Sequence, residues 1–181
     1  MAAADPVMEA DRLKERVRRA FANVERPPNG ALHAPDVGED GLLLEQDFRD
    51  KPDWRTLDAA FLDQAPCGFG SALSFFSPAA LRYFLPAYLI ADLEVRLDRV
   101  DVASRLSAPF TEAARNTAVN RRRYGSLTRF EEGQQRFAEF TVEEVAAIAA
   151  FLEHKAAADH AGVLPIAEAL ANYWRPRLAR G

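Results

Sequence analysis

The sequence predicts an all-α fold, a single compact helical domain built around a central helix that bends at a proline. The segment Ser77–Leu93 opens with a serine–proline pair, is apolar on nearly every side and carries Pro86 in its middle. Serine caps a helix N-terminus, proline is tolerated in the first turn, and an all-round apolar helix is enclosed by protein. Because Pro86 removes one backbone hydrogen bond and its ring strikes the carbonyl of Arg82, we expect a bend there.

A first helix is predicted near the N-terminus from an amphipathic pattern. Apolar residues recur at helical spacing at Leu13, Val17, Phe21 and Val24. This stripe, opened by the capping pair Asp5–Pro6, predicts a helix from about Pro6 to Val24. The segment Pro27–Gly30 then ends it.

Residues 26–52 lack a helical period and contain four prolines and three glycines. We therefore expect a long irregular loop between the first and second helices. Two interpretations stay open: a surface crossover holding a short strand or helical turn, or a functional loop. The length predicts one domain over residues 1–181, with frayed ends at 1–5 and 179–181.

The middle of the chain gives weaker signals. An aspartate cap predicts a short helix over residues 53–64, and residues 98–110 are expected to form another, ended by a proline. Residues 111–139 are polar and basic. Helix is favoured there, with interruptions expected at Gly125 and Gly133.

Two helices are expected at the C-terminal end. Thr141–Glu144 is a capping box, in which a hydroxyl and a carboxylate each reach a free N–H, and it starts a helix to about Ala158. Leu164–Pro165 is expected to start the last helix, which Pro176 then ends.

Composition narrows the class of protein. A chain that is 49% hydrophobic and 28% charged is ordinary for a globular protein, and a net charge of −4 argues against a general nucleic-acid binder. The apolar stretch Leu85–Ala91 is too short to span a bilayer, so no membrane contact is expected. A single cysteine, Cys67, cannot form an internal disulfide, and charges at Asp5 and Glu9 break any signal peptide. We therefore expect a cytoplasmic protein.

Three segments together resemble a known family. These are the helix start Asp53–Trp54, the block from Ala72 to Leu89 with its aromatic-leucine-proline-alanine core, and the stretch from Phe140 to Leu152. Over residues 8 to 155 the chain resembles DUF6714, a family of small bacterial proteins of unknown function. The resemblance implies a helical bacterial domain. It brings no activity, cofactor or catalytic residue, and the tail after His160 is expected to lie outside the shared region.

Candidates for catalysis or metal binding are few. His154 and His160 lie six residues apart, so they face different ways on a helix and match no zinc motif. Cys67 on a turn would need a base to act as a nucleophile, and a buried thiol is the more usual outcome. No catalytic, cofactor or metal residue is therefore assigned. Cys67, Tyr88 and His154 stay as candidates for a pocket beside Pro86.

Charged residues are distributed unevenly. Residues 36–63 carry nine acidic residues against three basic ones, whereas Arg115–Arg136 carries six arginines against two glutamates. A run of charged residues is usually a solvent-exposed face. Two patches of opposite charge can also neutralise each other within the fold, or one of them can attract a protein partner. The candidate interaction residues are Asp36, Glu39, Asp40, Arg121, Arg122 and Arg123.

We therefore predict a protein-interaction or regulatory module that uses an acidic surface and a protein partner. Nucleic acid is disfavoured, although Tyr124 beside the arginines could stack on a base. The alternative is an enzyme or a small-ligand-binding protein with a pocket beside Pro86. Convergence of Cys67, Tyr88 and His154 within about 4 Å around a cavity would favour that alternative.

Overall fold

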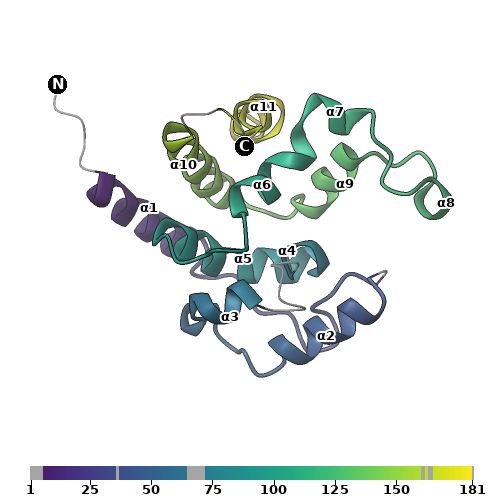
Figure 1. The fold of residues 1–181 in the computed structure, drawn as a ribbon, viewed down its shortest axis with the longest axis horizontal. Helices are drawn as coiled ribbons and strands as arrows, with labels where there is room; N and C mark the ends of the chain where they lie inside the picture. The colour runs from purple at the N-terminus through teal and green to yellow at the C-terminus, as the bar shows by residue number, and fades with distance from the viewer. Residues whose placement is uncertain (1–5, 36, 65–71, 160–161, 163–164, 181) are drawn as a thin grey trace. The chain divides into compact units, whose positions relative to one another are not determined.

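The computed structural model describes residues 6–35, 37–64, 72–159, 162 and 165–180 (Figure 1). These residues form helices and two isolated β-bridges, with no extended strand among them, which confirms the all-α class. Contacts within the chain group into two compact units, residues 1–101 (unit 1) and 102–181 (unit 2). The single domain stays a prediction. None of the described helices is long and apolar enough to cross a membrane.

Unit 1 is organised by α5 (Pro78–Leu93). The Ser77 hydroxyl accepts a hydrogen bond from the Ala80 N–H at 3.2 Å, and Pro78 occupies the first turn. Eleven of the sixteen helix residues are buried, Pro86 included, and the helix is continuous through Pro86. This confirms the enclosed helix that the sequence predicts.

The first helix, α1 (Pro6–Ala20), packs along α5 (Figure 1). Val17 in this helix and Phe21 directly after it are both fully buried in the core. The helix ends four residues before the predicted Val24, and the chain then turns.

The segment predicted as one helix over residues 53–64 is two elements, η1 (Trp54–Thr56) and α3 (Ala59–Gln64). Asp53 caps only the first, since its carboxylate accepts the Arg55 N–H at 2.9 Å. Asp58 starts the second by accepting the Phe61 N–H at 2.8 Å. Asp58 therefore begins a separate helix within the segment that the apolar spacing predicts as one helix.

The predicted irregular loop over 26–52 is wrong in its second half, because residues Glu39–Phe48 form helix α2. The buried residues of α2 are Gly41, Leu44, Glu45 and Phe48. Only two of these four are large and apolar, so the buried face gives no apolar stripe for the sequence to reveal. The helix starts after Gly38, which has a positive φ of 62° and makes no side-chain cap.

Helix α5 ends in a strained turn at Val95, which has a φ of 54°. The Val95 N–H donates to the Asp92 carbonyl at 2.9 Å and the Arg96 N–H donates to the Ala91 carbonyl at 3.0 Å. These two bonds define a Schellman C-cap, whose left-handed residue is usually glycine. A β-branched residue at this position is sterically disfavoured.

Replacing Val95 with glycine is expected to raise the free energy of unfolding by about 1 kcal/mol. The valine side chain is 89% exposed, so its removal loses little packing. Urea unfolding measures the change. Val95→Ala is the control, because it retains the Cβ that causes the strain. An equal gain from alanine would show that the strain at this Cβ is not the cause.

The helices of unit 2 pack around a core of aromatic side chains. Its first helices are α6 (Val102–Ser107), η2 (Ala108–Phe110), α7 (Glu112–Arg115), α8 (Arg121–Tyr124), α9 (Arg129–Arg136) and α10 (Val142–Ala158). The core rings are Phe110, Phe130, Phe137, Tyr173 and Trp174, all buried. The Phe110 and Tyr173 rings stack with centroids 3.8 Å apart.

The capping box that opens α10 is confirmed: Glu144 Oε2 accepts the Thr141 N–H at 3.0 Å, and Thr141 Oγ1 accepts the Glu144 N–H at 3.3 Å. Gly125 ends α8 with a φ of 63°. The predicted break at Gly133 is wrong, since that residue lies inside α9. A Cβ there would lie 2.7 Å from Pro109 Cβ, so glycine permits close helix contact rather than a turn.

The last helix runs through α11 (Ile166–Ala169), η3 (Leu170–Trp174) and α12 (Arg175–Leu178). Pro176 was expected to end it, and instead lies within it. In η3 the helix widens by one residue per turn, and the Arg175 N–H donates to the Leu170 carbonyl five residues back. The wider turn moves carbonyls away from the proline ring, which an ordinary turn would not do.

Candidate functional site

The inner face of α2 packs against the rest of unit 1 through buried side chains. Leu44 and Phe48 are fully buried, and the Phe48 ring lies 4.9 Å from Phe76 and 4.8 Å from Phe84. Glu45 is only 7% exposed, and its carboxylate accepts the backbone N–H groups of two loop residues. A buried carboxylate satisfied in this way holds the loop against the helix.

The loop that Glu45 binds consists of residues 30–34, between α1 and α2. Glu45 accepts from Gly30 and, at 3.2 Å, from Leu32. The other side of the loop meets α4 (Ala72–Phe75) and the start of α5. The Ala34 N–H donates to the Phe75 carbonyl and the Ser77 N–H donates to the Leu32 carbonyl, both at 2.9 Å. The loop is therefore tied to three elements.

The two ends of α2 are also held. Near the first turn, a Cβ on Gly41 would lie 2.7 Å from His33 Nδ1, so only glycine fits against this imidazole. At the other end, the Arg26 guanidinium donates to the Phe48 carbonyl at 2.9 Å and to the Lys51 carbonyl at 3.0 Å. Arg26 thus satisfies carbonyl groups that the helix end leaves free.

The outer face of α2 combines acidic side chains with two leucines. Leu42 is 60% exposed and Leu43 is 43% exposed. Glu39 and Asp47 lie one turn before and after Leu43 on the same face, because side chains four residues apart are neighbours on a helix. The exposed residues of this face are Glu39, Asp40, Leu42, Leu43, Gln46 and Asp47. We call this set the α2 surface.

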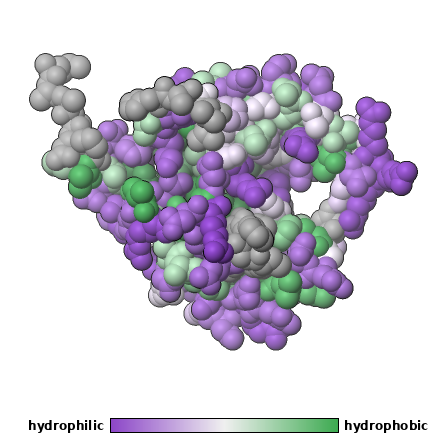
Figure 2. All heavy atoms as spheres, in the orientation of Figure 1, coloured by the Kyte–Doolittle hydropathy of each residue, from purple (hydrophilic) through white to green (hydrophobic). Residues whose placement is uncertain are grey.

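The α2 surface is negatively charged around an apolar centre. In Figure 2, apolar and hydrophilic side chains lie side by side in the lower right of the view, where α2 runs in Figure 1. Burial raises the pKa of Asp47, and the nearby Lys51 ammonium opposes this rise. Asp47 therefore loses its charge at a higher pH than an ordinary aspartate would.

Two of the predicted acidic residues, Glu39 and Asp40, lie on this surface and are exposed. Asp36 lies outside the described residues. Sequence analysis missed Leu42, Leu43 and Asp47 as surface residues. The sequence shows Leu42–Leu44 as an apolar run. Without the helix, nothing indicated which of its members face solvent.

The predicted basic residues Arg121, Arg122 and Arg123 form most of α8 in unit 2, and all three are exposed. Asn120 caps this short helix, since its Oδ1 accepts the Arg122 N–H at 3.1 Å. The Arg123 guanidinium lies 5.7 Å from the centroid of the Tyr124 ring. Their role in binding a partner stays a prediction.

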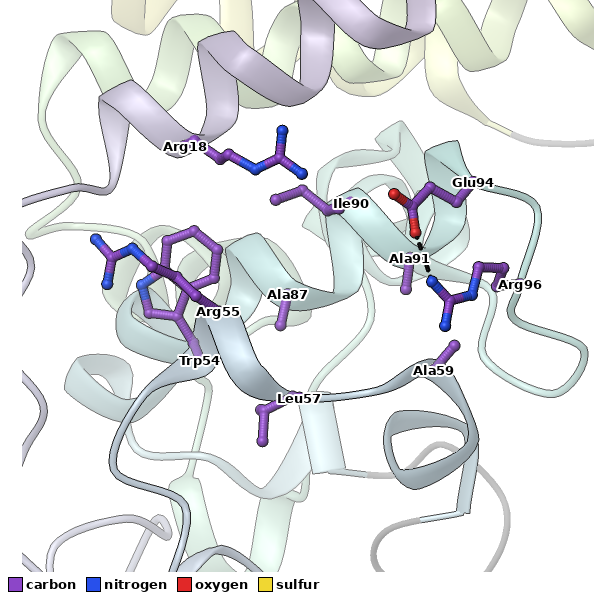
Figure 3. A pocket seen from close by; sticks show the side chains of 10 residues that line it. All are labelled: Arg18, Trp54, Arg55, Leu57, Ala59, Ala87, Ile90, Ala91, Glu94 and Arg96. Atoms are coloured by element: carbon purple, nitrogen blue, oxygen red, sulfur yellow. Dashed lines mark hydrogen bonds and ion pairs between the residues drawn. The ribbon is translucent and has the colours of Figure 1, made fainter.

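A small pocket lies beside α5 in unit 1 (Figure 3). Its volume is about 80 Å³, well below the several hundred Å³ of usual ligand pockets. Its wall includes Ala87, next to Pro86, and the ion pair between Arg96 Nη1 and Glu94 Oε2, which are 2.9 Å apart. Tyr88 does not line it.

The two described pocket candidates, Tyr88 and His154, lie in different units. Tyr88 is fully buried, and its hydroxyl has no hydrogen-bond partner among the described residues. Burial raises its pKa, and the charge of Asp63 raises it further, so the phenol stays protonated. His154 is half-buried on α10 in unit 2, and Cys67 lies outside the described residues. In the described part of the chain no group of three or more His, Cys, Asp or Glu could hold a metal ion.

Comparison with known proteins gives a family and no activity. A sequence model of the family described as "Family of unknown function (DUF6714)" matches residues 9–178. The match confirms the resemblance seen in the sequence. It also extends through the last helix, which was expected to lie outside the shared region. No curated protein and no solved structure matches the chain.

Proposed function

This chain belongs to the DUF6714 family, whose function is unknown, and we propose that it is a protein-binding module whose contact surface is the α2 surface. The observation that carries the proposal is the exposure of two adjacent leucines on a helix that is fixed from behind. The Glu45 carboxylate accepts from the main chain of the neighbouring loop, and the Arg26 guanidinium donates to the Phe48 carbonyl at the end of the helix. The surface is therefore pre-organised, and binding would cost little ordering entropy.

The energy of such a contact would come from Leu42 and Leu43. Fully burying a leucine side chain is worth about 1.5–3 kcal/mol. Leu42 is 60% exposed and Leu43 is 43% exposed, so burying what remains of the pair would contribute about 1.5–3 kcal/mol. They would act as the apolar centre of a larger interface.

The acidic residues would select the partner. Glu39, Asp40 and Asp47 place three carboxylates around the leucines. A partner with lysines or arginines around an apolar socket complements this pattern, and its charges would accelerate association. Nucleic acid, which carries the same sign of charge, would be repelled by this surface.

Affinity capture with matched variants tests the proposal. Leu42→Ser with Leu43→Ser should abolish capture of the specific partner from the native host. Glu39→Lys, Asp40→Lys and Asp47→Lys together should do the same. Glu39 and Asp40 lie in the first turn of α2, so their reversal should lower the free energy of unfolding by about 0.5–1 kcal/mol per site, because positive charge opposes the helix dipole. Mass spectrometry identifies the bound proteins, and titration with the purified partner gives the loss of affinity.

The control reverses the same number of charges elsewhere in unit 1. Glu9→Lys, Glu25→Lys and Asp98→Lys alter exposed acidic residues outside the α2 surface. This variant should retain the partner. Loss of capture in the control, or unchanged capture in both surface variants, would remove the α2 surface as the contact site.

A further inference from the structure

Unit 2 contains a basic pocket that no part of the proposed function uses. Its volume is about 180 Å³, and α7, α9 and the last helix supply its wall. Arg115, Arg177 and Arg180 contribute three positive charges, and the side-chain amides of Gln134 and Asn172 lie beside them. None of the described residues that line the pocket is acidic.

Arg177 supplies a fixed positive charge. Its guanidinium donates to the carbonyls of Phe137, Ala138 and Phe140, at 2.6 Å for the last two. It also donates to the Tyr173 hydroxyl at 2.6 Å. All four acceptors are neutral, so they fix the position of the charge without neutralising it.

Tyr173 supplies a hydrogen-bond donor. Its hydroxyl oxygen accepts from Arg177, so the hydroxyl proton must point away from that arginine. Its ring is fixed by stacking on Phe110, with centroids 3.8 Å apart. The side chain is only 7% exposed and lines the pocket, so its position is fixed before any ligand arrives.

The two other arginines differ in how they are held. The Arg115 guanidinium lies 3.8 Å from the centroid of the Phe130 ring, and its Nε donates to Glu112 at 3.2 Å. Stacking of this kind orients the guanidinium plane and leaves its edge for a ligand. Arg180 is exposed, and its backbone N–H donates to the Arg177 carbonyl at 3.4 Å.

The helix that carries half of this pocket has an unusual shape. Asn172 and Tyr173 both lie in the widened turn η3. Asn172 Nδ2 donates to the Phe110 carbonyl at 3.0 Å, which fixes the amide at the pocket edge. Widened turns of this kind recur at functional sites because they redirect side chains within a helix.

We propose that this pocket binds the phosphoryl group of a small molecule. The guanidinium groups of Arg115 and Arg180 can pair their N–H groups with phosphate oxygens, and the amides and the phenol add neutral donors. The Nη hydrogens of Arg177 are all taken by its four acceptors, so Arg177 contributes its positive charge. A volume of about 180 Å³ accommodates a phosphoryl group with part of its substituent rather than a whole nucleotide. The phosphoryl group is shared by free phosphate and phosphomonoesters.

Isothermal titration calorimetry on the full chain, at constant ionic strength, tests this inference with phenyl phosphate as the probe. Saturable binding is expected. Arg115→Gln should weaken it by about tenfold, because a hydrogen bond between charged groups is lost. Arg180→Gln should weaken it by about threefold, since this charge is exposed and screened. Arg180 is exposed and its backbone hydrogen bond to Arg177 does not involve the side chain, so the replacement should leave the fold intact.

Arg175→Gln is the matched control. Arg175 is an exposed arginine on the same helix, outside the pocket, and its Nη2 lies 2.9 Å from Glu153 Oε1. Its replacement should leave the affinity unchanged. An equal loss in this variant, or no saturable binding up to about 10 mM phenyl phosphate, would overturn the proposal.

Two further probes identify the chemistry. Benzoate, which replaces the phosphoryl group by a carboxylate, should bind at least about tenfold more weakly, and equal binding would overturn the phosphoryl assignment. Inorganic phosphate should compete with phenyl phosphate. Competition at equal affinity assigns free phosphate, and weaker competition assigns an ester; both results support recognition of the phosphoryl group. The pocket lies in unit 2, so these results are independent of the α2 surface.

Discussion

Replacing Trp174 with alanine is expected to lower the free energy of unfolding by about 3–5 kcal/mol. Trp174 is fully buried, and its ring centroid lies 5.4 Å from Phe110, 5.1 Å from Phe137 and 5.0 Å from Tyr173. The substitution removes these ring contacts and leaves a cavity that the surrounding helices fill only in part. Urea unfolding followed by far-ultraviolet circular dichroism measures the loss.

A pair of phenylalanine variants separates packing from hydrogen bonding. Trp174 Nε1 donates to the Leu106 carbonyl at 3.1 Å, whereas Trp54 Nε1 is buried without a partner among the described residues. Trp174→Phe leaves a buried carbonyl unsatisfied, and Trp54→Phe does not. We expect Trp174→Phe to cost about 1–2 kcal/mol more than Trp54→Phe. Equal costs would show that the Leu106 hydrogen bond contributes nothing.

Replacing Asp63 with alanine is the second large effect, with an expected loss of about 2 kcal/mol. The Asp63 carboxylate accepts three consecutive backbone N–H groups, from Asp98 at 3.1 Å, Arg99 at 2.8 Å and Val100 at 3.0 Å. These bonds join α3 to the segment after α5. Two of these three hydrogen bonds are exposed to solvent. In the alanine variant, water can therefore hydrogen-bond to the freed N–H groups and offset part of the loss.

The contribution of Asp63 depends on pH. Burial raises the pKa of this carboxyl, but the three backbone hydrogen bonds and the Arg99 charge together lower it below its usual value. The ionised form is therefore favoured in the folded state. Its stabilisation is fully present above the unfolded pKa of about 3.9 and is lost as the pH falls through the lower folded value.

Unfolding experiments from pH 7 down to about pH 3 check this dependence. The difference between the native protein and Asp63→Ala should stay constant near neutral pH and shrink below about pH 4. Asp98→Asn is the control, since that side chain is exposed and only its backbone N–H takes part. A difference that grows on acidification would contradict the assigned sign.

Several elements could be predicted because their causes are local. The capping box at Thr141 and Glu144 connects residues three apart, and the cap of α5 at Ser77 reaches only to Ala80. The same local signal opens α9, where Thr128 and Glu131 form a second capping box that sequence analysis overlooked. Such contacts form within one turn, so they need no knowledge of the rest of the chain.

Other features could not be predicted because their causes lie far away in the sequence. Helix α2 is fixed by Arg26, which is 22 residues from the Phe48 carbonyl that it binds. Gly133 lies against Pro109 and the Phe110 ring, which leave no room for a side chain. No pattern around either residue indicates these partners, since they depend on tertiary packing.

The same division applies to the candidate sites. The acidic character of residues 36–63 is visible in the sequence, and so is the run of three arginines in α8. Which leucines face solvent was decided by the burial of Leu44 and Phe48 on the opposite side of α2. The basic pocket joins Arg115 to Arg177 and Arg180, more than 60 residues later in the chain.

The sequence by itself determined the helical class, the enclosed helix around Pro86 and the helix starts that a hydroxyl or carboxylate caps. Apolar periodicity and capping act within a few residues, and they report burial and helix ends directly. Only the tertiary structure decided where α2 lies, how the last helix continues past Pro176, and which charged side chains share a pocket. Those outcomes depend on contacts between distant segments, which form only when the chain has folded.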